Sequence, residues 1–130
     1  MRRLHDPQIP IAERRAQAKA RVDREAEAVR LRYITPGDGQ QAVYIRKAQE
    51  AERYLAGENG PFPLLEASVG IEAPDVAGVA AIVAGIAEQW IGVAAVIEAK
   101  RLGAKKAIDE AATPAAIDAA AAVDWTIPGA

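Results

Sequence analysis

The sequence predicts an all-α protein: a small bundle or hairpin of alanine-rich helices preceded by an extended N-terminal arm and helix. The apolar residues recur at helical spacing, and no stretch shows the sustained alternation of a strand. Half of the 130 residues are apolar but only six are aromatic, so Ala, Val, Ile and Leu must build the core. Such a core buries little area per residue, at roughly 25 cal/mol for each apolar Å². We therefore expect the protein to be a homo-oligomer.

The first 34 residues are predicted to form an arm and an amphipathic helix, separate from a helical body over residues 35–130. Pro7 and Pro10 favour an extended arm, and the Ala-, Arg- and Glu-rich segment from residue 11 to about residue 32 favours a helix. A thin apolar stripe with Val22 and Val29 runs along this helix and is interrupted by Glu25. A narrow stripe suits a helix lying on a partner, which makes Val22 and Val29 interface candidates. A solvated amphipathic helix is the alternative.

A glycine-rich turn follows the first helix. It consists of Pro36, Gly37, Asp38 and Gly39. A phosphate cradle is one interpretation, but no GK[ST] follows and Asp38 places negative charge where phosphate would lie. Arg46 and Lys47 come two turns later, about 10 Å along the helix axis. We therefore interpret these four residues as the hinge between two helices.

Two helices are predicted after this hinge. The first runs from Gln40 to about Ala56 and ends at the stop signal in residues 57–61. A short helix over residues 64–69 is closed by Gly70. Glu50 and Glu52 lie two residues apart on the first of these helices, so they do not share a face and do not form a catalytic carboxylate pair.

A long helix is predicted from about Pro74 towards Ala111. Gly78, Gly85 and Gly92 recur at intervals of seven residues within it. Glycine in a helix interior costs roughly 1 kcal/mol relative to alanine. The repeat therefore predicts a groove in which another helix crosses at short range, with chance tolerance of glycine in an apolar segment as the alternative.

Two further residues of the long helix are candidates for function. Glu88 interrupts the apolar run and is interpreted as a residue at the rim of an interface, with a functional buried acid as the alternative. Trp90 is expected to be a core anchor or an interface hot spot. Beyond the long helix, Thr113 and Pro114 predict the start of a short last helix through about residue 122. Trp125 is expected to fold back as a terminal plug.

The composition excludes several classes of function. The chain has no cysteine and a single histidine, His5, so it offers no Ser-His or Cys-His pair and no histidine-rich metal cluster. We expect no enzyme activity, no cofactor and no metal. Residues 1–32 hold nine Lys and Arg against five Asp and Glu, too interleaved for nucleic-acid binding. The longest apolar run, residues 76–87, is shorter than the roughly 20 residues of a membrane span. Without a secretory signal pattern either, a soluble protein without a membrane partner is expected.

One run of the sequence carries a family resemblance. The residues YITPGDGQQAVY at 33–44, followed by Lys47 and Glu50-Ala51, resemble a "YITPGxGQ…Y..K..EA" pattern in small proteins of tailed bacteriophages and prophages of proteobacteria. The segments EASVGI, IEAKRLGAKKAI and ATPAAIDAA, with a late tryptophan, are also similar to these proteins. The similarity covers roughly residues 29–125.

The resemblance implies a protein of the phage tail. Members of the family are associated with tail-fibre or baseplate functions, and the family offers no catalytic residue to transfer. It implies a non-enzymatic structural component of the virion tail, made in the cytoplasm of the bacterial host, whose partners are other tail proteins. A tail-fibre assembly chaperone that is not retained in the virion is the alternative. An enzyme acting on cell-wall glycan or phosphate esters is a third hypothesis, based only on scattered acids and the glycine-rich turn.

Overall fold

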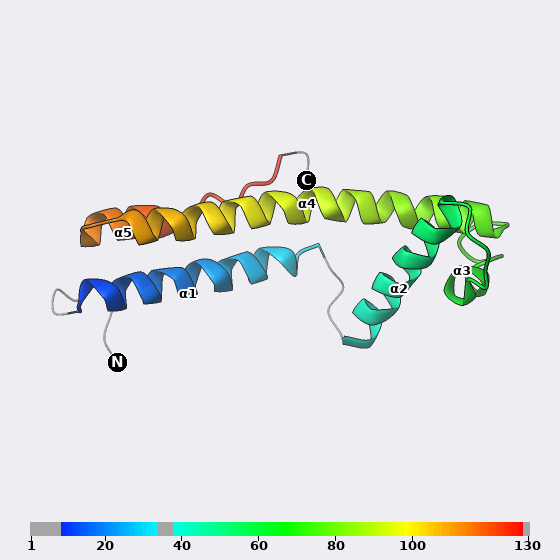
Figure 1. Ribbon diagram of the computed structural model, residues 1–130, viewed down its shortest axis with the longest axis horizontal. Coiled ribbons are helices and arrows are strands. Elements are labelled where there is room, and N and C mark those ends of the chain that lie inside the picture. The colour runs from blue at the N-terminus through cyan, green and yellow to red at the C-terminus, as the bar shows by residue number, and fades with distance from the viewer. Residues whose placement is uncertain (1–8, 34–37, 129–130) are drawn as a thin grey trace. The chain divides into compact units, whose positions relative to one another are not determined.

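The computed structural model describes residues 9–33 and 38–128, which contain five helices and no strand (Figure 1). The helices are α1 (Ile11–Arg30), α2 (Asp38–Leu55), α3 (Pro63–Ala67), α4 (Val76–Glu110) and α5 (Pro114–Ala121). The only β-type pairing in these ranges is an isolated bridge between Val69 and Ala73. The all-α prediction is therefore confirmed.

The described chain divides into two compact units. Unit 1 contains the described residues up to 32 and those from 93 onward, and unit 2 contains the described residues 33–92. Helix α4 contributes its C-terminal part to unit 1 and its N-terminal part to unit 2. This division differs from the predicted one, in which residues 1–34 stood apart from a single body over residues 35–130. The reason is that α1 packs against elements from the other end of the chain.

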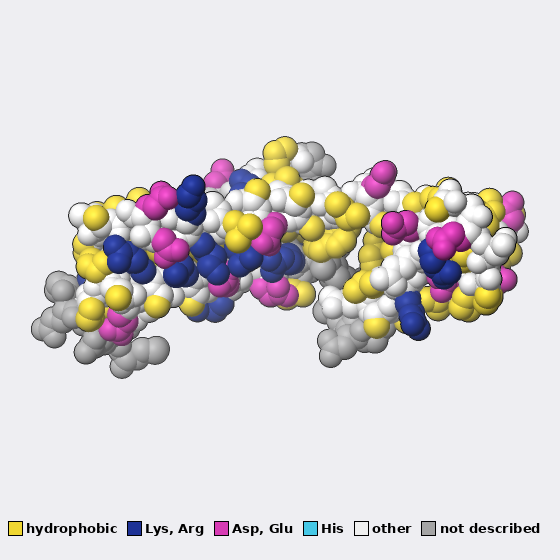
Figure 2. Space-filling model, viewed as in Figure 1, with side chains coloured by type: hydrophobic (Ala, Val, Ile, Leu, Met, Phe, Trp, Pro, Cys, Tyr) yellow, Lys and Arg dark blue, Asp and Glu magenta, His cyan; other side chains and the backbone are white. Residues whose placement is uncertain are grey.

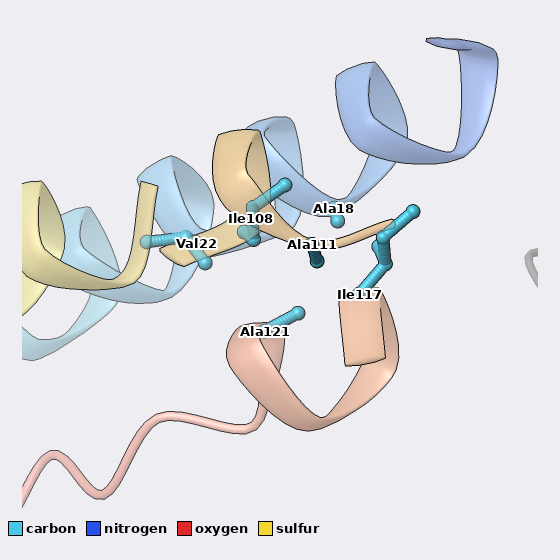
Figure 3. Close-up of a cluster of buried hydrophobic side chains, with 6 residues drawn as sticks. All are labelled: Ala18, Val22, Ile108, Ala111, Ile117 and Ala121. Carbon is cyan, nitrogen blue, oxygen red and sulfur yellow. The ribbon is translucent and has the colours of Figure 1, made fainter. Parts of the chain in front are cut away.

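Unit 1 is built on the packing of α1 along the C-terminal part of α4, with α5 folded back against them (Figure 1). Small and branched side chains from all three segments point toward one another in its core (Figure 3). This cluster consists of Ala18, Val22, Ile108, Ala111, Ile117 and Ala121. Val29 belongs to a neighbouring cluster of unit 1. Val22 is 0 % exposed and Val29 is 3 % exposed. The two predicted interface candidates thus lie in the core of the chain itself.

The turn between α4 and α5 is stabilised by side chains that form hydrogen bonds with backbone groups at the end of α4 and the start of α5. The Nη2 and Nε atoms of Arg15 donate to the carbonyl of Ala111 at 2.8 and 3.2 Å. The hydroxyl of Thr113 accepts the backbone N–H of Ala116 at 3.1 Å, and Pro114 is the first residue of α5. Both contacts occupy backbone groups that a helix terminus leaves without an intrahelical partner. The predicted start of the last helix is confirmed.

The segment after α5 returns along unit 1. Its Trp125 side chain packs against both core clusters of the unit, and its Nε1 donates to Glu25 at 2.9 Å. Ile127 is 8 % exposed and belongs to the cluster that contains Val29. Lys100 donates to the carbonyl of Asp124 at 2.7 Å. The prediction that Trp125 folds back as a plug is confirmed.

Unit 2 packs α2 and α3 against the N-terminal part of α4 (Figure 1). Its core is again small, with one aromatic residue, and consists of Ala51, Phe62, Leu65, Val79, Ala80 and Val83. Helix α2 begins at Asp38, two residues before the predicted start. Of the predicted hinge residues, Pro36 and Gly37 lie outside the described residues, while Asp38 and Gly39 are already helical.

The helix ends of unit 2 use glycine and aspartate. Gly57 has φ +83° and follows the end of α2. Its N–H donates to the backbone carbonyl of Tyr54, and the N–H of Glu58 donates to the backbone carbonyl of Arg53, both at 3.1 Å. This left-handed residue closes the helix, as the glycine-rich stop signal predicts. The carboxylate of Asp75 accepts the N–H of Gly78 at 2.7 Å. It therefore caps α4, which begins at residue 76, two residues after the predicted start.

Candidate functional site

The three glycines spaced by seven in α4 lie in different surroundings. A Cβ atom at Gly78 would lie 2.8 Å from the Cβ of Ala73, so Gly78 packs closely against the turn that precedes α4. At Gly85 and Gly92 a Cβ atom would meet no other part of the described chain within 4 Å. A helix that crosses at these two positions would therefore be none of the five described helices of this chain. Close packing at Gly85 and Gly92 stays a prediction.

These two glycines belong to an exposed face of α4 that is poor in charge. We call Ile82, Gly85, Gln89 and Gly92 the open face of α4, because they follow helical spacing and all four are exposed. Ile86 and Glu88 are also exposed and flank this face on either side. Ile82 is 43 % exposed and Ile86 is 49 % exposed. Ile82 and the flanking Ile86 give this side of α4 exposed apolar surface, which makes it a candidate for contact with another protein.

The opposite side of the same helix segment is covered. Val79 and Ala80 are 0 % exposed and Val83 is 4 % exposed, because they pack in the core of unit 2. Trp90, the predicted core anchor or hot spot, is half-buried. The N-terminal part of α4 therefore packs on one side and leaves the other side open.

Helix α4 is the one helix of the described residues that is long and apolar enough to cross a membrane by length and composition. Core helices of proteins that contact no membrane meet the same criterion, but such helices are mostly buried, whereas 17 % of the apolar window of α4 is buried in the molecule. The expectation of no membrane partner therefore stays a prediction.

Unit 1 carries a network of charged side chains between α1 and α4. Asp23 accepts from Arg101 Nη1 at 2.9 Å and from Lys105 Nζ at 2.9 Å. Arg101 also donates to Glu98 at 2.7 Å. Figure 2 shows Lys, Arg, Asp and Glu side chains gathered in a band over the part of the molecule that contains α1. Because Asp23 lies on α1 and its two partners lie on α4, the network fastens these helices together.

The electrostatics of this network oppose acid–base catalysis. The hydrogen bond from Lys105, and then that from Arg101, lowers the pKa of Asp23. The hydrogen bond from Arg101 likewise lowers the pKa of Glu98 and is the main cause of that shift. A general acid at neutral pH needs a carboxyl pKa that is raised toward 7. These carboxylates are instead held in the charged form, which suits a structural ion pair.

Two further carboxylates of unit 1 behave in the same way. Burial alone would raise the pKa of Glu25, but the hydrogen bonds from Trp125 and Arg21 outweigh it, and the pKa is lowered. Hydrogen bonds from Thr126 lower the pKa of Asp124. Glu25 therefore holds the returning C-terminal segment in place as a charged acceptor, while the carboxylate of Asp124 fixes a local turn within that segment.

Glu50 is a buried acid of unit 2, and its role is structural. It is 5 % exposed, and its Oε1 accepts the backbone N–H groups of Leu64 at 2.9 Å and Leu65 at 3.2 Å. These donors belong to the first turn of α3, which has no partner for them within the helix. Glu50 thus caps α3 from α2, a role that the sequence analysis did not identify. Glu52 is exposed, so the two acids are separated as predicted.

The two basic residues considered for phosphate binding lie in different surroundings. Lys47 forms an ion pair with Glu72 at 2.8 Å, whereas Arg46 is exposed. Within the described ranges, 9–33 and 38–128, no group of three or more His, Cys, Asp or Glu side chains is placed to hold a metal ion.

Comparison of the chain with protein-family models, with curated proteins and with solved structures gave no match. The candidate site therefore rests on the geometry of the molecule. The feature with the clearest capacity for function is the open face of α4, whose apolar and glycine surface suits contact with another protein.

Proposed function

We propose that this protein is a non-enzymatic structural component of a phage tail, acting through contacts with other tail proteins at the baseplate or at the site of tail-fibre attachment. The observation that carries the proposal is the run Tyr33–Tyr44, which resembles small tail proteins of bacteriophages and prophages. In this proposal the protein is made in the bacterial cytoplasm, associates with copies of itself, and is retained in the virion tail.

The surface of the molecule supports a binding role. The open face of α4 exposes Ile82 and the two glycines Gly85 and Gly92, at which no other part of the described chain lies within 4 Å of a Cβ position. Such a surface is expected in a protein that is stable mainly within an assembly, because a neighbouring subunit covers it there. Apolar surface of this kind gains free energy when a neighbouring subunit covers it, at roughly 25 cal/mol per Å².

The placement of the acids supports a role without catalysis. Glu50, the acid that would serve best as a buried catalytic group, is engaged by two backbone donors. Asp23 and Glu98 are engaged by Arg101. An enzyme acting on glycan or phosphate esters would need a carboxylate or cation directed at substrate. Glu88 is exposed beside the open face of α4 and is interpreted as a rim residue, not as a catalytic acid. Glu88→Gln is expected to leave phage production unchanged.

Mass spectrometry of purified particles tests the proposal. The phage or induced prophage that encodes this chain is purified by density gradient, and the protein is quantified against the tail-tube protein. A structural component appears at a fixed number of copies per particle. Absence from intact particles would contradict a structural role.

A tail-fibre assembly chaperone is the second candidate, and the same open face favours it because a chaperone holds apolar client surface. A deletion separates the two candidates. Loss of a structural component gives tails that lack the part it forms. Loss of a chaperone gives complete tails with missing or misfolded fibres, while the protein itself is absent from wild-type particles.

A further inference from the structure

We propose that the open face of α4 pairs with the same face of a second copy of this chain, with the two α4 helices antiparallel. In this arrangement Ile82 of one copy packs over Gly92 of the other, and Gln89 packs over Gly85. The inference does not rest on the role in a phage tail, since pairing can occur or fail whatever particle contains the protein.

Side-chain size is the first argument for a second copy. The open face alternates large and small residues in the order Ile82, Gly85, Gln89, Gly92. At both glycines the space above the backbone is open, with nothing of the described chain within 4 Å of a Cβ position. Each large side chain therefore has, on the same face, a glycine over which the matching side chain of a second copy can pack. A surface that carries both the large residues and the glycines is self-complementary, as an interface across a two-fold axis requires.

The same sizes select the antiparallel orientation. In an antiparallel pair every layer contains one large and one small residue, so the helices keep a uniform separation. In a parallel pair Ile82 would oppose Ile82 and Gly85 would oppose Gly85. The isoleucines would then hold the helices apart and leave voids at the glycines, which forfeits packing. Glu88 flanks the face and stays in water in the antiparallel pair, where repulsion between exposed carboxylates is small.

A lipid bilayer fits this face less well than a second copy does. The other side of the same helix segment packs against α2 and α3, and α2 carries the buried Glu50 and Lys47, which pairs with Glu72. Glu88 and Gln89 also lie in the middle of the apolar stretch. One charged side chain at the centre of a bilayer costs about 2.5–3.5 kcal/mol on insertion scales. A protein surface accommodates these groups at its rim.

Cysteine cross-linking tests the register, because the chain contains no cysteine. Two single variants of the full chain are made, Ile82→Cys and Gly92→Cys, one of them carrying a mass tag. Both positions are exposed, so the fold is expected to be kept, which circular dichroism checks. A disulfide needs Cα atoms about 4.4–6.8 Å apart. In the antiparallel pair position 82 meets position 92, whereas identical positions lie ten residues apart, about 15 Å along the axis.

The expected result is a cross-linked dimer in the mixture of the two variants and little cross-linking of either variant alone. Ile91→Cys is the matched control, because Ile91 is 64 % exposed on the same helix but lies away from the open face. Cross-linking of each variant with itself would show a parallel pair and overturn the proposal. So would cross-linking of Ile91→Cys to the same extent as the mixture, or no cross-linking at 100 µM protein.

Flotation with vesicles of phosphatidylcholine and phosphatidylglycerol forms the second arm. The wild-type chain is expected to stay in the aqueous fraction. Flotation that is lost on Ile82→Asp substitution would assign the open face to a membrane and overturn the pairing.

Discussion

The two units use the same helix in opposite ways. In unit 1, α4 faces α1 across a seam fastened by Asp23, Arg101 and Lys105, and the returning segment with Trp125 covers one side. In unit 2, α4 packs on one side only and leaves Ile82 exposed on the other. Unit 1 exposes two large apolar side chains, those of Leu31 and Leu102, whereas most of the exposed large apolar side chains of the described residues belong to unit 2. In the proposed function, we therefore expect the interaction site to lie on unit 2.

Each unit contains one of the two tryptophans, so the unfolding of each unit can be followed separately by fluorescence. Trp125 reports on unit 1 in a Trp90→Phe background, and Trp90 reports on unit 2 in a Trp125→Phe background. Urea unfolding followed by fluorescence then gives a free energy of unfolding that is assigned to one unit.

The largest expected effect is a cavity in the core of unit 1. Ile108 is 0 % exposed, and Ile108→Ala is expected to lower the free energy of unfolding read by Trp125 by about 2–5 kcal/mol. Ile82→Ala is the matched control on the open face, where Ile82 is 43 % exposed. At protein concentrations too low for pairing, the control should change the value read by Trp90 by less than about 1 kcal/mol. Equal losses would mean that the open face is covered within the chain.

The next effect concerns the buried cap of unit 2. Glu50→Ala leaves the N–H groups of Leu64 and Leu65 without their acceptor. The free energy of unfolding read by Trp90 should fall by about 1–3 kcal/mol. Glu52→Ala, at an exposed position of the same helix, should have little effect. If both variants unfold alike, Glu50 does not have the structural role assigned to it.

These contacts also mark how far the sequence could predict the structure. The all-α class, the long helix and the start of α5 at Thr113 and Pro114 follow from periodicity and local capping chemistry. The burial of Val22 does not, because its core partner Ile108 lies far away along the chain. The cap formed by Glu50 was missed for the same reason, since its donors are 14 and 15 residues away. Local patterns indicate that an apolar stripe needs covering, but not which segment covers it.

A smaller effect is expected from acid, and it concerns unit 1. Because Asp23, Glu25, Glu98 and Asp124 have pKa values lowered in the folded chain, the unfolded chain takes up protons first as the pH falls. Their stabilisation is complete above the ordinary carboxyl pKa and is lost as the pH falls through the lowered values. The urea midpoint read by Trp125 should therefore be lower at pH 3 than at pH 7.

Asp23→Asn tests the origin of this acid sensitivity. The substitution removes the charged acceptor shared by Arg101 and Lys105. The variant should be less stable than the wild type at pH 7, and its midpoint should change less between pH 7 and pH 3. An unchanged pH dependence would show that this network does not stabilise unit 1.

The smallest effect is expected from an ion pair on the outer surface of α4. Lys106 and Glu110 lie 4.0 Å apart with side chains 78 % and 67 % exposed. Lys106→Ala should change the free energy of unfolding by less than about 1 kcal/mol, because exposed pairs are screened by water and salt. If Lys106→Ala lowers the free energy of unfolding as much as Asp23→Asn does, ion pairs between helices do not stabilise this protein more than exposed pairs within one helix.

Sedimentation equilibrium of the wild-type chain and of Gly85→Leu tests the central claim that the open face of α4 is an interface. The open space at Gly85 accommodates leucine within one chain, so the variant should keep its helix content and its melting temperature at low concentration. Gly103→Leu is the control, at another exposed glycine of α4 with open space, outside the paired segment. The wild type and the control should reach twice the 13.7 kDa mass of the chain, and Gly85→Leu should remain at that mass. A monomeric wild type, or a Gly85→Leu variant that associates as the wild type does, would contradict the claim.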